Sequence, residues 1–261
     1  MVTKYGNCVL ITCVVFLVPF VLNAQWLETT IPVGNGPIAL VYNSTNNKVY
    51  CANIFDCNIT VIDGASNTVI GTIGVGSYPW FMVYNLINNK VYCTLENMNV
   101  AVIDAEGDTV IGMIPVGIEP YALVYNQTNN KVYCANYLAN TVSVIDGGGD
   151  TVITTVGVGG EPGALIWNAT SNKVYCANNG SNSVTLIDGV SNSIITTIPV
   201  GSSPNAQCWN STSNTVYCAN WNSDDVTIID GVTDTIITTV QVGVGPSALC
   251  WNSSGNKVYC A

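Results

Sequence analysis

Residues 116–155, VGIEPYALVYNQTNNKVYCANYLANTVSVIDGGGDTVITT, carry a pattern that recurs through most of the chain. A glycine that follows a valine recurs with this pattern, at Gly34, Gly76, Gly117, Gly159, Gly201 and Gly243. The spacing is 42 residues, except for one step of 41 between Gly76 and Gly117. A proline three residues after each glycine and a Tyr-Cys pair such as Tyr133-Cys134 keep the same phase. A period of this length predicts a fold built from repeated supersecondary units.

The single short step has a visible cause. The segment from Cys93 to Asp104 is one residue shorter than the corresponding segments of the other copies. We therefore predict that one loop of the second copy lacks a residue.

Each copy contains four short apolar runs separated by polar turn residues, which is typical of β-strands. In the third copy the runs cover residues 122–125, 131–135, 141–145 and 151–158. No helical period of 3.6 extends beyond a turn, so we expect almost no helix after the N-terminal segment. The fourth run alternates Thr with Ile or Val and tolerates proline, as at Pro115 and Pro199. Proline is confined to sheet edges, so the fourth strand is predicted at the outer edge and the first at the inner edge.

A four-stranded antiparallel sheet that repeats without a long spacer predicts an all-β fold, a β-propeller whose blades bury a core between them. Residues 27–33 match the fourth strand alone, and five full copies follow over 35–76, 77–117, 118–159, 160–201 and 202–243. A sixth copy begins at residue 244 and stops after its second strand. We therefore expect five full blades, a lone N-terminal strand and a partial sixth blade. This pattern predicts that the sequence is a fragment of a six- or seven-bladed ring. Further blades, and any anchoring or sorting domain, would then follow Ala261.

The first 24 residues differ from the repeats. Lys4 precedes an apolar run over residues 8–22, and the small residue Ala24 follows. This order predicts a signal peptide over residues 1–24, cleaved after Ala24, and a secreted, cell-surface or periplasmic propeller over residues 25–261. The alternative is an uncleaved anchor, but the run is short for a helix of about 20 spanning residues and Pro19 interrupts it.

Composition excludes several classes of partner and catalyst. The chain has 16 acidic and six basic residues, no His and a net charge of −10, so nucleic acid is not an expected partner. Without His, a Ser-His-Asp triad, an HExxH zinc site and CxxCH haem attachment are all excluded. No spacing selects an opposed pair of carboxylates, and we expect no cofactor. Each Asp that ends a third strand, such as Asp146, is interpreted as a turn residue rather than as part of a ring of metal ligands.

Six of the eleven cysteines occupy one repeat position, the last residue of the Val-Tyr-Cys motif. Equivalent positions on stacked sheets lie about 10 Å apart, too far for a disulfide. These cysteines are therefore interpreted as small buried hydrophobic residues. Only the cross-strand pairs Cys208–Cys218 and Cys250–Cys260 remain candidates for disulfides.

Where the copies disagree, the sequence points to a binding surface. In an antiparallel meander, the connections that enter the first strand and those that join the second to the third strand emerge at the same end. The variable residues there include aromatic and acidic side chains, which favour ligand binding. The alternative is that they are drifted loop residues. The candidate ligand-binding residues are Tyr78, Trp80, Glu119, Tyr121, Tyr137, Glu161 and Trp221.

The segments VYCAN, VSVIDG and TTIPVG resemble the YVTN β-propeller repeats of bacterial and archaeal surface and secreted proteins. Cys-Ala replaces the Val-Thr of the name-giving motif, and the resemblance covers nearly all of residues 27–261. It implies a propeller, usually of seven blades, but no catalytic residue. The expected function is a non-catalytic scaffold that binds a protein or carbohydrate. The alternative is a propeller enzyme of lactonase or quinoprotein type with an acidic, metal-assisted site.

Overall fold

The computed structural model describes residues 28–261. The signal peptide predicted over residues 1–24 lies outside the described residues. Within residues 28–261, no helix has the length and apolar character needed to cross a membrane. The helix found in this part of the chain is one short 3-10 turn, Asn179–Ser181. The fold is therefore all-β, as the absence of a helical period predicted.

Five four-stranded sheets and one two-stranded sheet make up the segment Ile31–Ala261. Strand order in every sheet follows the sequence, and neighbouring strands are antiparallel. The first three sheets contain β1 (Pro37–Asn43), β2 (Lys48–Asn53), β3 (Asn58–Asp63) and β4 (Thr68–Gly74); β5 (Pro79–Asn85), β6 (Lys90–Leu95), β7 (Asn99–Asp104) and β8 (Thr109–Pro115); and β9 (Pro120–Asn126), β10 (Lys131–Asn136), β11 (Thr141–Asp146) and β12 (Thr151–Gly157).

The remaining sheets contain β13 (Pro162–Asn168), β14 (Lys173–Asn178), β15 (Ser183–Asp188) and β16 (Ile194–Pro199); β17 (Pro204–Asn210), β18 (Thr215–Asn220), β19 (Asp225–Asp230) and β20 (Ile236–Gln241); and the hairpin β21 (Leu249–Asn252) with β22 (Lys257–Cys260). These bounds confirm the four strands predicted for each full copy. The loop between β6 and β7 has three residues where the loop between β10 and β11 has four. The missing loop residue is thereby located.

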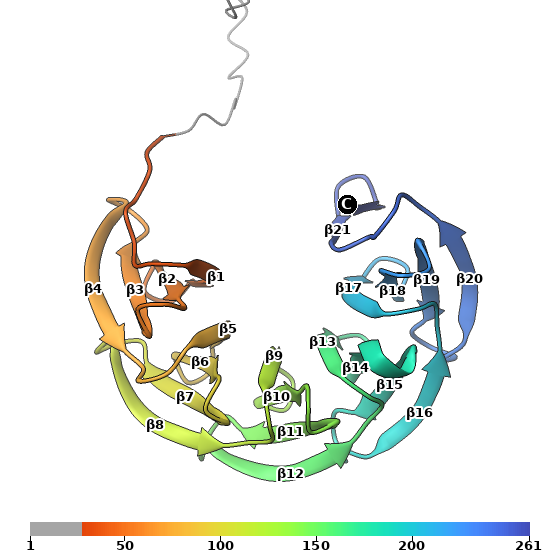
Figure 1. Cartoon of the computed structure of the whole chain (residues 1–261), viewed down its shortest axis with the longest axis horizontal. Helices are drawn as coiled ribbons and strands as arrows, with labels where there is room; N and C mark the ends of the chain where they lie inside the picture. Colours follow the sequence, from red (N-terminus) through yellow and green to blue (C-terminus); the bar gives the residue numbers. More distant parts are fainter. Residues whose placement is uncertain (1–27) are drawn as a thin grey trace, which may run out of the picture. The chain divides into compact units, whose positions relative to one another are not determined.

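Within Ile31–Ala261, consecutive sheets follow an arc, with the first strand of each sheet on the inside and the fourth on the outside (Figure 1). The inner strands β1, β5, β9, β13, β17 and β21 contact one another in that order. Outer strands such as β12 alternate exposed and partly buried residues. The predicted inner and outer edges are therefore confirmed.

The core lies between consecutive sheets, because the second and third strands are buried on both faces. Each of the four hydrophobic clusters combines the tyrosine of one Val-Tyr-Cys motif with the cysteine of the next, for example Tyr92 with Cys134. Burying one large apolar side chain contributes about 1.5–3 kcal/mol. No single sheet could bury both of its faces alone.

The two disulfide candidates are not formed. Cys208, Cys218, Cys250 and Cys260 are all free thiols. The residue opposite Cys208 is Tyr217, so Cys218 is displaced by one position along its strand. A displacement of one residue turns a side chain to the other face of the sheet. The same offset separates Cys250 from Cys260, because Cys250 lies opposite Tyr259.

The lone N-terminal strand predicted over residues 27–33 is wrong for the described part, since residues 28–33 form no strand. A strand exists only through pairing with a neighbour. The strand that would pair with it is the third of a sheet, and the hairpin β21–β22 provides only a first and a second strand.

Candidate functional site

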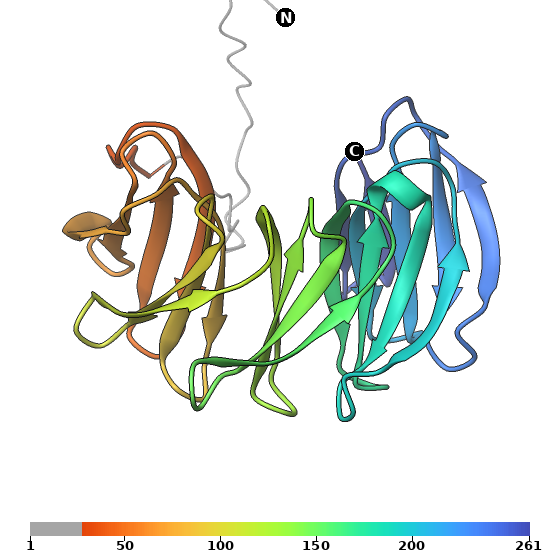
Figure 2. The same cartoon turned by 60° about the horizontal axis from the view of Figure 1, so that its bottom comes forward.

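Two kinds of connection meet at one end of every full sheet (Figure 2), as the meander topology predicts. One leads into the first strand, and the other joins the second strand to the third. We call this end the loop face; in the third sheet it comprises residues 116–119 and 137–140. The Tyr137 amide donates to the Glu119 carbonyl at 2.8 Å, and the Asn179 amide donates to the Glu161 carbonyl at 2.9 Å. These bonds fix the two connections relative to each other.

A cavity of about 690 Å³ opens at the loop face, along the inner strands. It is lined by Phe81, Glu119, Tyr121, Ala122, Leu123, Tyr137, Gly163, Ala164, Leu165, Asn179, Asn205 and Ser247. The lining residues come from several sheets, so no single copy could form the cavity.

The cavity arises from a difference in side-chain size between copies. The residue after the repeated proline is aromatic in two copies, Trp80 and Tyr121. At the same position the following copies have Gly163, Asn205 and Ser247, which all line the cavity. The small residues leave space on one side, and the aromatic residues form a wall on the other.

Tyr121 is the centre of the aromatic wall. Its ring centroid lies 5.0 Å from that of Phe81, 5.8 Å from that of Tyr137 and 6.4 Å from that of Trp80. The rings are tilted by 39–57°, which is within the range favoured for aromatic pairs. Rings held in this way offer a rigid apolar surface with polar hydroxyl groups at its edge.

Two glutamates flank the aromatic wall. The Tyr137 hydroxyl donates to Glu161 Oε2 at 3.0 Å. Burial raises the pKa of Tyr137, and the hydrogen bond to Glu161 and the nearby negative charges of Glu161 and Glu119 raise it further. A Cβ at Gly180 would lie 2.9 Å from Glu161 Cδ, so glycine leaves room for this carboxylate.

Five of the seven predicted ligand-binding residues gather here. Glu119, Tyr121 and Tyr137 line the cavity. Trp80 and Glu161 are not part of this lining but neighbour it, Trp80 beside Tyr121 and Glu161 beside Tyr137. The structure does not bring the other two into the lining: Tyr78 is exposed, and the exposed ring of Trp221 covers Gly245.

Phe81 lines the cavity and was not among the predicted residues. Every other copy has alanine at this position, as at Ala122 and Ala164, and this difference was the available signal. The register of β5 on β6 also shifts over a longer stretch, between Pro79 and Met82, than in the other sheets. The Phe81 amide donates to Thr94 Oγ1 at 3.0 Å within this irregular stretch.

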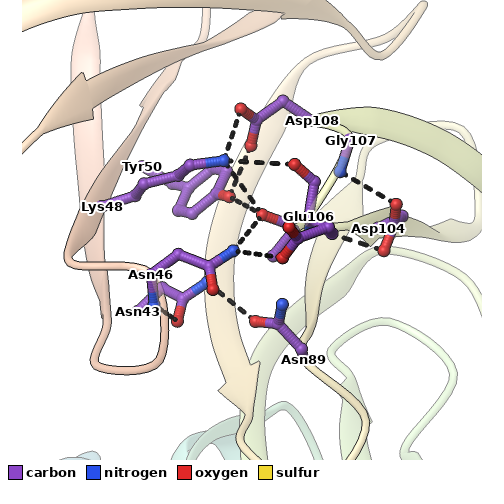
Figure 3. A network of polar contacts seen from close by, with 10 residues as sticks. Asn43, Asn46, Lys48, Tyr50, Asn89, Asp104, Glu106, Gly107 and Asp108 are labelled. Carbon is purple, nitrogen blue, oxygen red and sulfur yellow. Dashed lines mark hydrogen bonds and ion pairs between the residues drawn. The ribbon is translucent and has the colours of Figure 1, made fainter.

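The opposite end of the sheets, which we call the turn face, joins each sheet to the next. Lys48 and Tyr50 of the first sheet both bind Asp108 of the second, each at 2.7 Å (Figure 3). Lys90 and Tyr92 bind Asp150 in the same way, and Lys173 and Tyr175 bind Asp234. In the third sheet, Lys131 and Tyr133 bind Asn192.

Asparagines extend these links across the turn face. The side-chain amide at the end of each first strand donates to an asparagine of the following copy, in the pairs Asn43–Asn89, Asn85–Asn130, Asn126–Asn172, Asn168–Asn214 and Asn210–Asn256, at 2.8–3.0 Å. The sequence showed that these residues repeat but not which of them pair. The aspartates that end the third strands accept backbone amides of their own turns, for example Gly149 N to Asp146 Oδ2 at 2.8 Å.

Among residues 28–261, no group of three or more His, Cys, Asp or Glu side chains is placed to hold a metal ion. No family model matches the chain, and no curated protein matches it.

Proposed function

We propose that this chain is part of a secreted or cell-surface β-propeller of the YVTN type and that it binds a protein or carbohydrate partner without catalysis. The 42-residue period and the arc of face-to-face sheets support the propeller (Figure 1). The resemblance of VYCAN and VSVIDG to the YVTN repeats supports the type. The charged and apolar order of residues 1–24 supports export.

One observation carries the binding proposal: the copies diverge where the cavity forms. Gly163, Asn205 and Ser247 leave the space, while Phe81, Tyr121 and Tyr137 line it with aromatic rings. Packing alone would favour similar residues in each copy at equivalent positions. Concave sites with aromatic walls and a few polar groups are the usual form of ligand pockets.

The test is a screen of the full chain against glycan and peptide arrays, with Tyr121→Ala screened beside it. Removing a central aromatic anchor costs about 2 kcal/mol or more of binding energy. We therefore expect at least one ligand whose affinity falls more than tenfold in Tyr121→Ala.

Phe55→Ala is the matched control, because Phe55 is an exposed aromatic residue of the loop face outside the cavity. It should leave the same affinity unchanged. A ligand set that is identical for wild type and Tyr121→Ala would reject the cavity as the binding site. Export is tested separately by N-terminal sequencing of the secreted protein, which should begin at Gln25.

A further inference from the structure

The charges of the two ends of the sheets are unequal. Lys48, Lys90, Lys131, Lys173 and Lys257 each begin a second strand and therefore lie at the turn face. The chain has no His, and its six basic residues are these five and Lys4. Within residues 28–261, the loop face thus has no basic side chain.

The loop face does carry carboxylates, namely Asp56, Glu96, Glu119, Glu161, Asp224 and Asp225. Several are engaged by backbone or side-chain amides, as Asp56 is by Asn35 N at 2.7 Å and Asp225 by Asn220 Nδ2 at 2.6 Å. Within residues 28–261, the Glu119 carboxylate accepts no hydrogen bond, and Glu161 accepts one, from the Tyr137 hydroxyl. Glu119, which lines the cavity, and Glu161, which neighbours the lining residue Tyr137, therefore both have acceptor capacity left.

The backbone at both glutamates is left-handed, as it also is at Ser203, the equivalent residue of the fifth copy. Glu119 has φ +55° and Glu161 has φ +53°, in the left-handed region. The equivalent residues of the first and sixth copies are Gly36 and Gly245, which adopt this conformation without a Cβ. A non-glycine residue there costs about 1–2 kcal/mol, and glutamate has no short side chain to offset that cost.

The aromatic wall complements these negative charges. The faces of Tyr, Phe and Trp rings attract a cation within about 6 Å of the ring centroid. Four such rings, those of Trp80, Phe81, Tyr121 and Tyr137, cluster beside Glu119 and Glu161. An anion would meet the negative charges of Glu119 and Glu161 and no basic side chain of the loop face. A neutral ligand would use the rings but leave the carboxylates without a counter-charge.

We infer that the cavity binds an organic ammonium group, primary or quaternary, with its charge between Glu119, Glu161 and the ring of Tyr121. This inference rests on the proposed binding function and names the chemistry of its ligand. The cavity volume of about 690 Å³ exceeds the volume of one ammonium group. The rest of the ligand therefore lies against Gly163 and Asn205. Asn205 lines the cavity and adds a polar side chain to that part of the wall.

The decisive experiment compares two probes of the same shape, choline and its neutral carbon isostere 3,3-dimethylbutan-1-ol, with n-butylammonium as the primary amine. Binding to the full chain is measured by calorimetry and by Trp fluorescence at low salt. We expect choline or n-butylammonium to bind at least about tenfold more tightly than the isostere, as a desolvated cation–π contact with added carboxylates implies. The affinity should fall as salt is raised.

Two variants locate the site. Glu161→Gln and Tyr121→Ala should each weaken binding of the cation by about fivefold or more, because they remove a charge and a ring face respectively. Glu96→Gln is the matched control, since Glu96 lies on the loop face outside the cavity lining, and it should change the affinity less than twofold.

The outcomes separate this inference from the proposed function. Equal affinity of the isostere and the cations, or unchanged cation affinity in Glu161→Gln, would overturn the ammonium inference and leave the binding function intact. Failure of both cations to bind, while an array ligand still depends on Tyr121, would have the same meaning. If the binding of neither the cations nor any array ligand depended on Tyr121, both the ammonium inference and the proposed binding function would be rejected.

Discussion

The link between the first two sheets gives a sharp test of how this repeat protein is held together. Asp108 accepts a bond from Lys48 Nζ and another from the Tyr50 hydroxyl, each at 2.7 Å. It has φ +52°, so alanine would add backbone strain to the loss of the carboxylate. Glycine adopts this conformation freely, and Asp108→Gly therefore removes the bonds with little added strain.

The magnitude follows from burial. The Lys48 and Asp108 side chains are 14% and 23% exposed, so this ion pair is neither fully exposed nor fully buried. An exposed ion pair contributes about 0–1 kcal/mol, and breaking a buried one costs about 3–5 kcal/mol. The carboxylate also serves Tyr50, so we expect Asp108→Gly to lose about 2–3 kcal/mol. For a chain of this size the loss lowers the melting temperature by about 5–10 °C.

Asp108→Asn is the matched control, because the structure already contains its equivalent. Asn192 accepts bonds from Lys131 at 2.8 Å and from Tyr133 at 3.1 Å in the same geometry. We therefore expect Asp108→Asn to lose about 1 kcal/mol or less. Urea unfolding measures both variants, and hydrogen exchange should show faster opening of β2 than of β14, since repeat stability depends on nearest-neighbour interfaces. A loss below about 0.5 kcal/mol in Asp108→Gly would refute the reasoning.

Three further predictions concern single residues. Gln207→Leu should raise stability by about 1–2 kcal/mol in urea unfolding, because both amide atoms of Gln207 are buried without partners within residues 28–261 and unsatisfied groups of this kind are costly. Backbone amides of its own turn, that of Ser191 first, lower the pKa of Asp188 from 3.8. The stabilisation that ionised Asp188 contributes is present above pH 3.8 and is lost as the pH falls through the lowered pKa. The variant Asp188→Asn should therefore show a smaller fall of the urea midpoint between about pH 6 and 2. Iodoacetamide at pH 8 should label exposed Cys250 in the native protein but not Cys218, because burial raises the pKa of Cys218 to about 12 and the thiolate is the reactive form.

Each of these predictions has an outcome that contradicts it. A lower urea midpoint for Gln207→Leu would mean that the amide contributes to the native state. An unchanged acid slope in Asp188→Asn would mean that the turn bonds are equally strong in the unfolded chain. Equal labelling of Cys218 and Cys250 would mean that β18 opens on the timescale of the reaction.

The sequence predicted the strands well because the same pattern occurs several times. A strand that is predicted in one copy is supported by the same pattern in the other copies. The predicted bounds of 131–135 and 141–145 lie within one residue of the observed strands. Pairing beyond a single sheet was harder to predict. The lone strand over residues 27–33 was wrong because strand propensity does not provide a partner, and the link from Lys48 to Asp108 joins residues 60 positions apart in different copies.

The candidate site could be predicted only in part. Differences between copies at the loop face identified Glu119, Tyr121 and Tyr137, because a repeat makes any departure visible. They did not exclude Trp221, since depth within the cavity depends on how the inner strands tilt relative to one another. Phe81 was missed because the copies were compared at the loop face, and Phe81 lies within β5, one residue beyond Trp80.

The two ends of the sheets therefore differ in what they can tolerate. At the turn face, the lysines and tyrosines near the start of the second strands of the first four sheets bond to the next copy, as do the asparagines that end the first strands of the five full sheets. A change at these positions therefore weakens an interface between sheets. At the loop face the connections are held by backbone bonds such as Tyr137 N to Glu119 O, together with side-chain acceptors such as Asp56 and Asn140. The Tyr121 side chain makes none of these bonds, so we expect it to change without loss of the fold. This separation explains why the copies diverge at the cavity, and it predicts that Tyr121→Ala loses ligand while Asp108→Gly loses stability.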